Sequence, residues 1–354
     1  MPSIPDTISR ARRPALRRAV AILLSAVVLA GCAQTGGSVA PSAVIVRTPP
    51  QPMFGIEWLN DDTLVIEYAL GQGAAFRLAA VSVSDGAFRP LPVPSSDGCE
   101  QIQVGNPTVL APGRLAVTRE CVAPFGSGIP DRTTIWELDI ATGQYALRGS
   151  AGTIRGPSGT IAASPDGKRL IVAMGSLCGV IVEAGAVGAI PLAVEIADGT
   201  RSFRLDDTAP GPDCSHRGWA DYPAWSPTAN EIAFFAAPAA TGLDGPARGG
   251  APANLYVMAP DATTASLILS NITVPRDLDY SPDGHYLAFG GLIGGRTATW
   301  ILDRGTGVLR AVYDRRFEWL SWSPDGTRLA GLQQSNTDRL LDNEIVIVPL
   351  DKLR

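Results

Sequence analysis

The stretch Trp322-Ser323-Pro324-Asp325-Gly326-Thr327-Arg328-Leu329-Ala330-Gly331 decides the fold of this chain, because it recurs. Clear copies span residues 163–172 and 280–289, a degraded copy spans 225–234, and two more are implied at 58–66 and 109–117. In each clear copy proline fixes φ, aspartate accepts local backbone hydrogen bonds, and glycine takes the positive φ that follows. Because alternating apolar residues flank the turn, each copy predicts a β-hairpin. Asp166, Asp283 and Asp325 are therefore interpreted as turn residues.

A second turn follows each hairpin about twenty residues later. Its copies lie at residues 84–86, 139–143, 198–200, 261–263 and 303–307. Each copy separates two strand-like runs, such as 299–302 and 309–312. One unit thus contains four antiparallel strands, and repetition of this unit predicts a β-propeller.

The combined pattern, W-S-P-D-G-x-x-L-A-F followed by a D-x-x-T-G turn, resembles the WD40-like (PD40) repeats of TolB-like propellers. The resemblance extends over nearly all of the chain after its N-terminal segment. It implies the fold and leaves the function open, because propellers host many unrelated activities.

The copies predict six blades. The last blade has strand-like runs at 320–323, 328–332 and 344–350, and lacks a fourth. Residues 43–47 form a strand-like run that belongs to no hairpin of the first blade. We expect this run to complete the last blade and close the ring, which removes exposed sheet edges. The expected fold is an all-β, six-bladed β-propeller of four-stranded antiparallel blades over residues 43–354, with the ring closed by an N-terminal strand.

The first 31 residues have the features of a secretory leader. Five arginines precede an apolar run at residues 19–30, which is shorter than the roughly 20 residues that span a bilayer. Leu29-Ala30-Gly31-Cys32 resembles the bacterial lipobox, in which the cysteine receives a diacylglycerol and the leader is cut just before it. We expect lipidation at Cys32, a flexible tether over residues 32–42, and an extracytoplasmic protein anchored to a membrane of the cell envelope. An anchor helix with an incidental cysteine and a twin-arginine export signal are the alternatives.

The charge of the chain argues against nucleic acid as a partner. The leader carries five arginines and Asp6, so its removal takes the formal net charge from −5 to −9. A nucleic-acid-binding protein normally presents a basic stripe, and the remaining charges here are scattered.

Four cysteines remain after Cys32: Cys99, Cys121, Cys178 and Cys214. An even number in an exported chain favours two disulfides, with three possible connectivities. If the four strands of a unit are named A to D in chain order, the loops from D to the next A and from B to C share one face of a propeller, here called the loop-rich face. The blade layout places all four cysteines on this face, which favours the pairings Cys99–Cys121 and Cys178–Cys214. Reduced buried thiols and a metal site are the alternatives, although no CxxC or histidine cluster accompanies the cysteines.

No complete catalytic set is evident in the sequence. It contains no G-x-S-x-G elbow, no P-loop and no strand-linked G-x-G-x-x-G, so we expect neither an enzyme nor a cofactor. Of the two histidines, His285 lies in a hairpin turn and is expected to be solvated. His216 lies in a loop, where it is either a surface residue or a general base.

The loop-rich face is the expected binding surface, because loops on a rigid scaffold commonly carry function. Arginines beside aromatic residues often anchor protein interfaces. The candidates are His216, Arg217, Trp219, Arg276, Arg315 and Arg316, and their alternative role is in solvated loops or salt bridges between blades.

We therefore expect a monomeric, non-enzymatic lipoprotein that binds an envelope protein or a cell-wall component. A propeller enzyme or carbohydrate-binding protein with a site in the central funnel is the main alternative. A sensor domain that regulates an envelope partner is a third.

Overall fold

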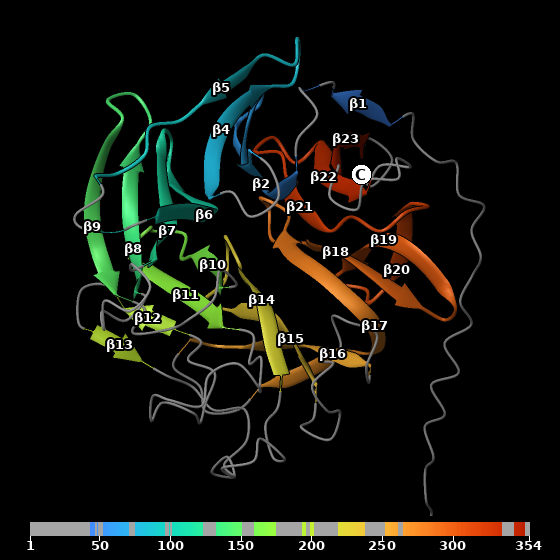
Figure 1. Ribbon diagram of the computed structural model, residues 1–354. Coiled ribbons are helices and arrows are strands. Elements are labelled where there is room, and N and C mark those ends of the chain that lie inside the picture. The colour runs from blue at the N-terminus through green and yellow to red at the C-terminus, as the bar shows by residue number, and fades with distance from the viewer. Residues whose placement is uncertain are drawn as a thin grey trace, which may run out of the picture. The chain divides into compact units, whose positions relative to one another are not determined.

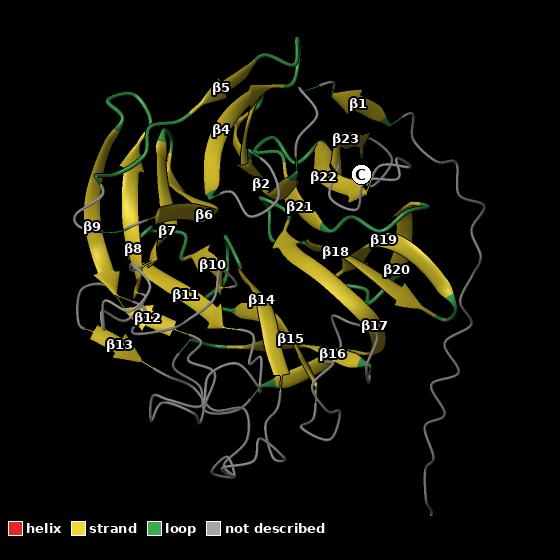
Figure 2. Cartoon of the chain, viewed as in Figure 1, coloured by secondary structure: helices red, strands yellow, loops and turns green. Residues whose placement is uncertain are grey.

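The computed structural model describes residues 43–46, 48, 52–70, 75–95, 99, 101–122, 132–150, 159–174, 193–195, 199–201, 219–237, 252–260, 265–334 and 343–350. These residues form 23 β-strands. Figure 2 shows that the described elements are strands and loops, with no helix among them. All strand pairs are antiparallel, which agrees with the all-β prediction. In the described part of the chain, no helix has the length and hydrophobicity to cross a membrane.

Each predicted unit forms its own run of neighbouring strands (Figure 1). The first sheet contains β2 (Met53–Asn60), β3 (Thr63–Ala69), β4 (Phe76–Ser82) and β5 (Phe88–Pro90). The second contains β6 (Gln101–Ala111), β7 (Arg114–Val122), β8 (Arg132–Asp139) and β9 (Gln144–Ser150). The third contains β10 (Gly159–Ala163), β11 (Arg169–Met174), β12 (Ala193–Glu195) and β13 (Gly199–Arg201).

The next sheet has seven strands, because one long strand serves two units. It contains β14 (Trp219–Trp225), β15 (Ile232–Ala237), β16 (Ala253–Met258), β17 (Ser266–Tyr280), β18 (Tyr286–Ile293), β19 (Arg296–Asp303) and β20 (Leu309–Tyr313). The first part of β17 pairs with β16, and its second part, from Thr273, pairs with β18. The strand that ends one unit thus continues directly into the strand that begins the next.

The last sheet brings the two ends of this region together. It contains β21 (Trp319–Trp322), β22 (Arg328–Gln334), β23 (Asn343–Pro349) and, beside β23, the N-terminal β1 (Val44–Val46). Val44 lies opposite Ile347 and Val46 lies opposite Ile345.

The first strands of the units contact one another in chain order. β2 contacts β6, β6 contacts β10, β10 contacts β14, β14 contacts β17, and β17 contacts β21. β21 in turn contacts β2. Apolar side chains fill the space between neighbouring sheets. Between the first and last sheets, for example, Ile56 and Leu64 pack in one cluster with Leu332 and Ile345.

The recurring turns adopt the predicted conformation. Ser164 Oγ donates a hydrogen bond of 2.6 Å to Asp166 Oδ1, and the Lys168 amide donates to the same oxygen at 3.1 Å. These hydrogen bonds lower the pKa of Asp166 and keep it ionised. Gly167 closes the turn at φ +66°. The same contacts recur at Asp283 and Asp325, which confirms that these carboxylates are turn residues.

The residues on either side of the turns also lie where the repeat predicts. Trp225, Tyr280 and Trp322, each just before a turn, are buried in the core. The His285 side chain is 78% exposed, as expected of a solvated turn residue.

Candidate functional site

The first strands of the units, called the inner strands from here on, surround a cavity of about 190 Å³. Residues from β2, β6, β10, β14, β17 and β21 all line it. Its polar lining includes Glu57, Asn106, Thr160, Asp277 and Asp279.

Three inner strands bulge at corresponding places in their units. Pairing shifts between Gly105 and Thr108 in β6, between Asp221 and Ala224 in β14, and between Arg276 and Leu278 in β17. Each bulge contains a non-glycine residue with positive φ: Asn106 at 48°, Tyr222 at 52° and Asp277 at 36°. Such residues are uncommon, and a bulge redirects the side chains around it. The bulges thus shape the polar wall of the cavity.

Two carboxylates of β17 accept hydrogen bonds from backbone amides at the free edge of β21. Strand β21 is terminal in its sheet, so part of its backbone lacks a strand partner. Asp277 Oδ2 accepts a hydrogen bond of 2.7 Å from the Leu320 amide, and Asp279 Oδ2 accepts one of 2.8 Å from the Trp322 amide. The two aspartates thus link β17 to β21.

Strand β2, in the first sheet, also contacts β21. The Trp58 amide donates to Ser321 Oγ at 3.2 Å, and Trp58 Nε1 donates to the Ser321 carbonyl at 3.1 Å. Glu57 hydrogen-bonds the Ser321 side chain and accepts a 3.3 Å hydrogen bond from the Val109 amide. Three carboxylates from neighbouring sheets therefore contact β21: Glu57, Asp277 and Asp279.

The pKa values of these three carboxylates are raised, so each loses its proton at a higher pH than an ordinary carboxyl group. Burial raises the pKa of Glu57 and of Asp277 to about 7 in each case. Burial, followed by the nearby charge of Glu57, raises the pKa of Asp279 well above its usual range. Buried carboxylates that interact in this way do not all carry charge at neutral pH.

Two further carboxylates make similar contacts between units. Asp221, on β14, accepts a 2.8 Å hydrogen bond from Thr160 Oγ1 on β10, and burial raises its pKa to about 6. Glu67, on β3, accepts a 2.7 Å hydrogen bond from the Asn106 amide, and burial raises its pKa to about 7.

The predicted arginine anchors Arg276 and Arg316 converge on one carboxylate. Arg276 Nε lies 2.5 Å from Glu318 Oε2, and Arg316 donates through Nε at 3.0 Å to Glu318 Oε1. Both ion pairs are about one-fifth exposed. Arg315, by contrast, is exposed, and its backbone carbonyl accepts a hydrogen bond from Thr299 Oγ1. Arg315 is thus the described candidate whose side chain is most available to a partner.

Other predicted residues fall outside the described part of the chain. These are Cys32, Cys178, Cys214, His216 and Arg217. Trp219 begins β14, but its side chain is not described.

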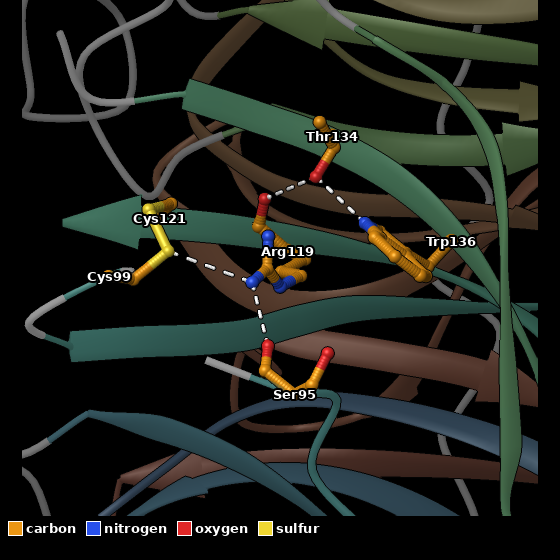
Figure 3. The surroundings of a disulfide bond; sticks show 6 residues. All are labelled: Ser95, Cys99, Arg119, Cys121, Thr134 and Trp136. Carbon is orange, nitrogen blue, oxygen red and sulfur yellow. Dashed lines mark hydrogen bonds between the residues drawn. A yellow bond between two sulfur atoms is a disulfide. The ribbon is translucent and has the colours of Figure 1, made fainter. Parts of the chain in front are cut away.

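A disulfide joins Cys99 to Cys121, the local pairing that the blade layout favoured (Figure 3). Among the described residues, no group of three or more histidine, cysteine, aspartate or glutamate side chains could hold a metal ion. The carboxylates around the cavity can accept hydrogen bonds and hold protons.

The sequence prediction missed these carboxylates. One available signal was the alternation Asp277-Leu278-Asp279-Tyr280 immediately before a clear hairpin turn. In a strand, this alternation puts two carboxylates on one face.

Comparison with known proteins supports the fold. No family model matches the chain, and no curated protein matches its sequence. The crystal structure of TolB from Acinetobacter baumannii is 15% identical and has a TM-score of 0.54, with 82% of this chain and 64% of that chain covered. This chain therefore spans less than two thirds of that TolB.

Oligogalacturonate lyases are also similar in structure. One, in complex with manganese, is 10% identical with a TM-score of 0.52, and the match covers 90% of this chain and 95% of that chain. Another, from Vibrio parahaemolyticus, has the same identity and TM-score and 96% coverage of its own chain. At such identities the likeness shows the fold alone, which is a TolB-like β-propeller fold.

Proposed function

We propose that this protein is a lipid-anchored, non-enzymatic binding scaffold of the cell envelope. The observation that carries the proposal is a TolB-like propeller fold in a chain whose leader-like first 31 residues run into a lipobox-like Leu29-Ala30-Gly31-Cys32. The proposed partner is an envelope protein or a cell-wall component, and the proposed binding surface is the loop-rich face around Arg315. The scaffold is a monomer.

Photocrosslinking tests the binding surface. A photoreactive amino acid at position 315 should crosslink a specific envelope component in intact cells, because Arg315 is exposed on the proposed face. The matched control is position 285, which is exposed in a hairpin turn on the opposite face. Adducts are identified by mass spectrometry. Equal adducts from both positions, or none from position 315, would contradict the assignment.

Replacement of Cys32 tests the anchor. The Cys32→Ser protein should lose incorporated radiolabelled fatty acid and leave the membrane fraction, because the proposed acceptor thiol is gone. A Ser42→Ala variant, ten residues along the tether, should keep both. Membrane retention of Cys32→Ser without the label would mean that something other than lipid anchors the chain.

We propose that the propeller has six blades and that β1 closes its ring. Support comes from the pairing of β1 with β23 and from the successive contacts of the inner strands. Val46 is buried in this arrangement, whereas Val44 on the same strand is 55% exposed.

Val46→Asp should therefore reduce the free energy of unfolding by about 2–4 kcal/mol, since it places a carboxylate among apolar side chains. Val44→Asp adds the same charge at the exposed position and should change the free energy by less than about 0.5 kcal/mol. Urea denaturation measures both. Similar effects of the two substitutions would argue that β1 does not pack against the last sheet.

A central-funnel ligand is a second candidate, favoured by the convergence of Glu57, Asp277 and Asp279 at the cavity. The function would then be that of a carbohydrate-binding protein or propeller enzyme. A panel of neutral and acidic oligosaccharides should raise the melting temperature of the wild type but not of Asp277→Asn. The absence of any shift would remove this candidate without affecting the proposed loop-face scaffold.

A further inference from the structure

A buried arginine contacts the disulfide of the second sheet. Arg119, on β7, is 6% exposed. Its Nη2 atom lies 3.6 Å from Cys99 Sγ and 2.8 Å from the Ser95 carbonyl oxygen. Figure 3 shows the guanidinium group beside Cys99, between the disulfide and Ser95.

The surroundings hold Arg119 in this position. Its guanidinium carbon lies 5.4 Å from the centre of the Trp136 ring, at a distance typical of a cation–π contact. Trp136 Nε1 donates to Thr134 Oγ1 at 2.8 Å, and Thr134 Oγ1 donates to the Arg119 carbonyl at 3.2 Å. The positive charge is thus fixed by both its side-chain and its backbone contacts.

A fixed cation beside one sulfur makes the two halves of a disulfide unequal. A nearby arginine stabilises a thiolate and lowers the pKa of the thiol. In thiol–disulfide exchange, the sulfur with the lower thiol pKa leaves faster. Cys99 is therefore the favoured leaving group and Cys121 the favoured point of attack. Both cysteines are half-buried, so neither is sealed from solvent.

We propose that Cys99–Cys121 is a site of directional thiol–disulfide exchange with a dithiol reductant, with Arg119 as the positioning residue. A thiolate of the reductant attacks Cys121 Sγ and forms a mixed disulfide. The Cys99–Cys121 bond breaks, and its electron pair leaves on Cys99 as a thiolate beside the guanidinium group. The second thiol of the reductant, as its thiolate, then attacks the reductant's own sulfur in the mixed disulfide. Cys121 leaves as a thiolate, and the reductant becomes an intramolecular disulfide.

This exchange adds a redox response to the scaffold. The disulfide ties the segment just before β6 to the end of β7. Reduction releases that tie on the loop-rich face and leaves the strand pairing of β6 with β7 in place. The exchange site is independent of the proposed partner, because its chemistry is measured on the isolated protein.

Mapping of the mixed disulfide tests the direction of attack without any substitution. The oxidised wild-type protein is treated briefly with limiting reduced glutathione, quenched in acid and digested for mass spectrometry. Glutathione should be found on Cys121 at least fivefold more often than on Cys99. Equal labelling, or an excess on Cys99, overturns the proposal.

Replacement of Arg119 tests the role of its charge. Arg119→Met should slow reduction by dithiothreitol several-fold, because loss of the guanidinium charge raises the pKa of the Cys99 thiol and makes it a poorer leaving group. In the fully reduced wild-type protein, iodoacetamide should alkylate Cys99 faster than Cys121 near neutral pH. Arg119→Met should abolish this difference. Arg119→Lys, which keeps the charge, should restore part of both effects.

Arg114→Met is the matched control. Arg114 begins the same strand and pairs with Glu137, away from the disulfide. This variant should reduce at the wild-type rate. Unchanged reduction and alkylation in a folded Arg119→Met protein would overturn the role of Arg119, and the glutathione map decides the direction of attack even if that variant does not fold.

Discussion

Raising the pH from about 5 to about 8 should lower the free energy of unfolding by several kcal/mol. The cause is a set of five carboxylates, whose pKa values are all raised because the protein partly or fully removes them from water: the buried Glu67 and the half-buried Glu57, Asp221, Asp277 and Asp279. Between the ordinary carboxyl pKa near 4 and the folded-state values of about 6 to 7, the folded protein binds protons that the unfolded chain has released. Stability must therefore fall as pH rises through this window.

Glu67 gives the clearest measure of the effect, because burial dominates its shift and no other charged group contributes to it. A change of pKa from 4.5 to about 7 corresponds to about 3 kcal/mol at full ionisation. The turn aspartates act in the opposite sense. Hydrogen bonds lower the pKa of Asp166, so its contribution to stability is lost only as pH falls below about 4.

Glu67→Gln should make the free energy of unfolding fall less steeply between pH 5 and 8. Glutamine retains an acceptor for the Asn106 amide and cannot ionise. Asp166→Asn is the control, and it should leave the slope between pH 5 and 8 unchanged because Asp166 is ionised throughout. Urea denaturation at several pH values measures the slope. A wild-type stability that is constant or rises between pH 5 and 7.5 would show that these carboxylates are not buried as described.

The hairpins could be predicted because their turn chemistry is local. Proline, aspartate and glycine act within four residues, so Asp166, Asp283 and Asp325 could be assigned without knowledge of the rest of the chain. Repetition of this local unit predicted the β-propeller, and the resemblance of the repeated motif to TolB-like repeats added the family of folds. One feature that repetition did not predict is β17, in which two strands expected in different units form one continuous strand.

The cavity carboxylates could not be predicted because their environment comes from distant segments. Asp277 and Asp279 bind amides 43 residues further along the chain. In the sequence they are simply acidic residues in a strand, which are usually solvated. Arg276 and Arg316 were singled out as separate anchors for the same reason. Nothing local indicates that both reach Glu318.

The last hairpin contains a substitution that another segment compensates. Where two other copies place Phe234 and Phe289, both fully buried, this copy has Gly331. The ring of Phe317, which precedes β21, occupies the place that a side chain at Gly331 would take. Phe317 is fully buried and stacks on Tyr313, with ring centres 5.0 Å apart.

Gly331→Ala should therefore cost about 1–3 kcal/mol or more, because its new methyl group overlaps the Phe317 ring. Phe317→Ala should cost about 3–5 kcal/mol, because it leaves a cavity in the core. Thr299 Oγ1, which donates to the Arg315 carbonyl and accepts from the Phe317 amide, links this packing to the exposed arginine. Gly331→Ala should thus also weaken crosslinking from position 315.

The two substitutions together distinguish a specific clash from general damage. In the Phe317→Ala background the ring is gone, so Gly331→Ala should be neutral or stabilising, and the two costs should be strongly non-additive. Gly305→Ala is the control, since its methyl group would meet only ordinary contacts and should change stability by less than about 0.5 kcal/mol. Urea denaturation of the four proteins in the cycle provides the coupling energy. Additive costs would mean that Gly331 and Phe317 do not share this space, and that the missing phenylalanine of the last hairpin is not replaced from the preceding loop.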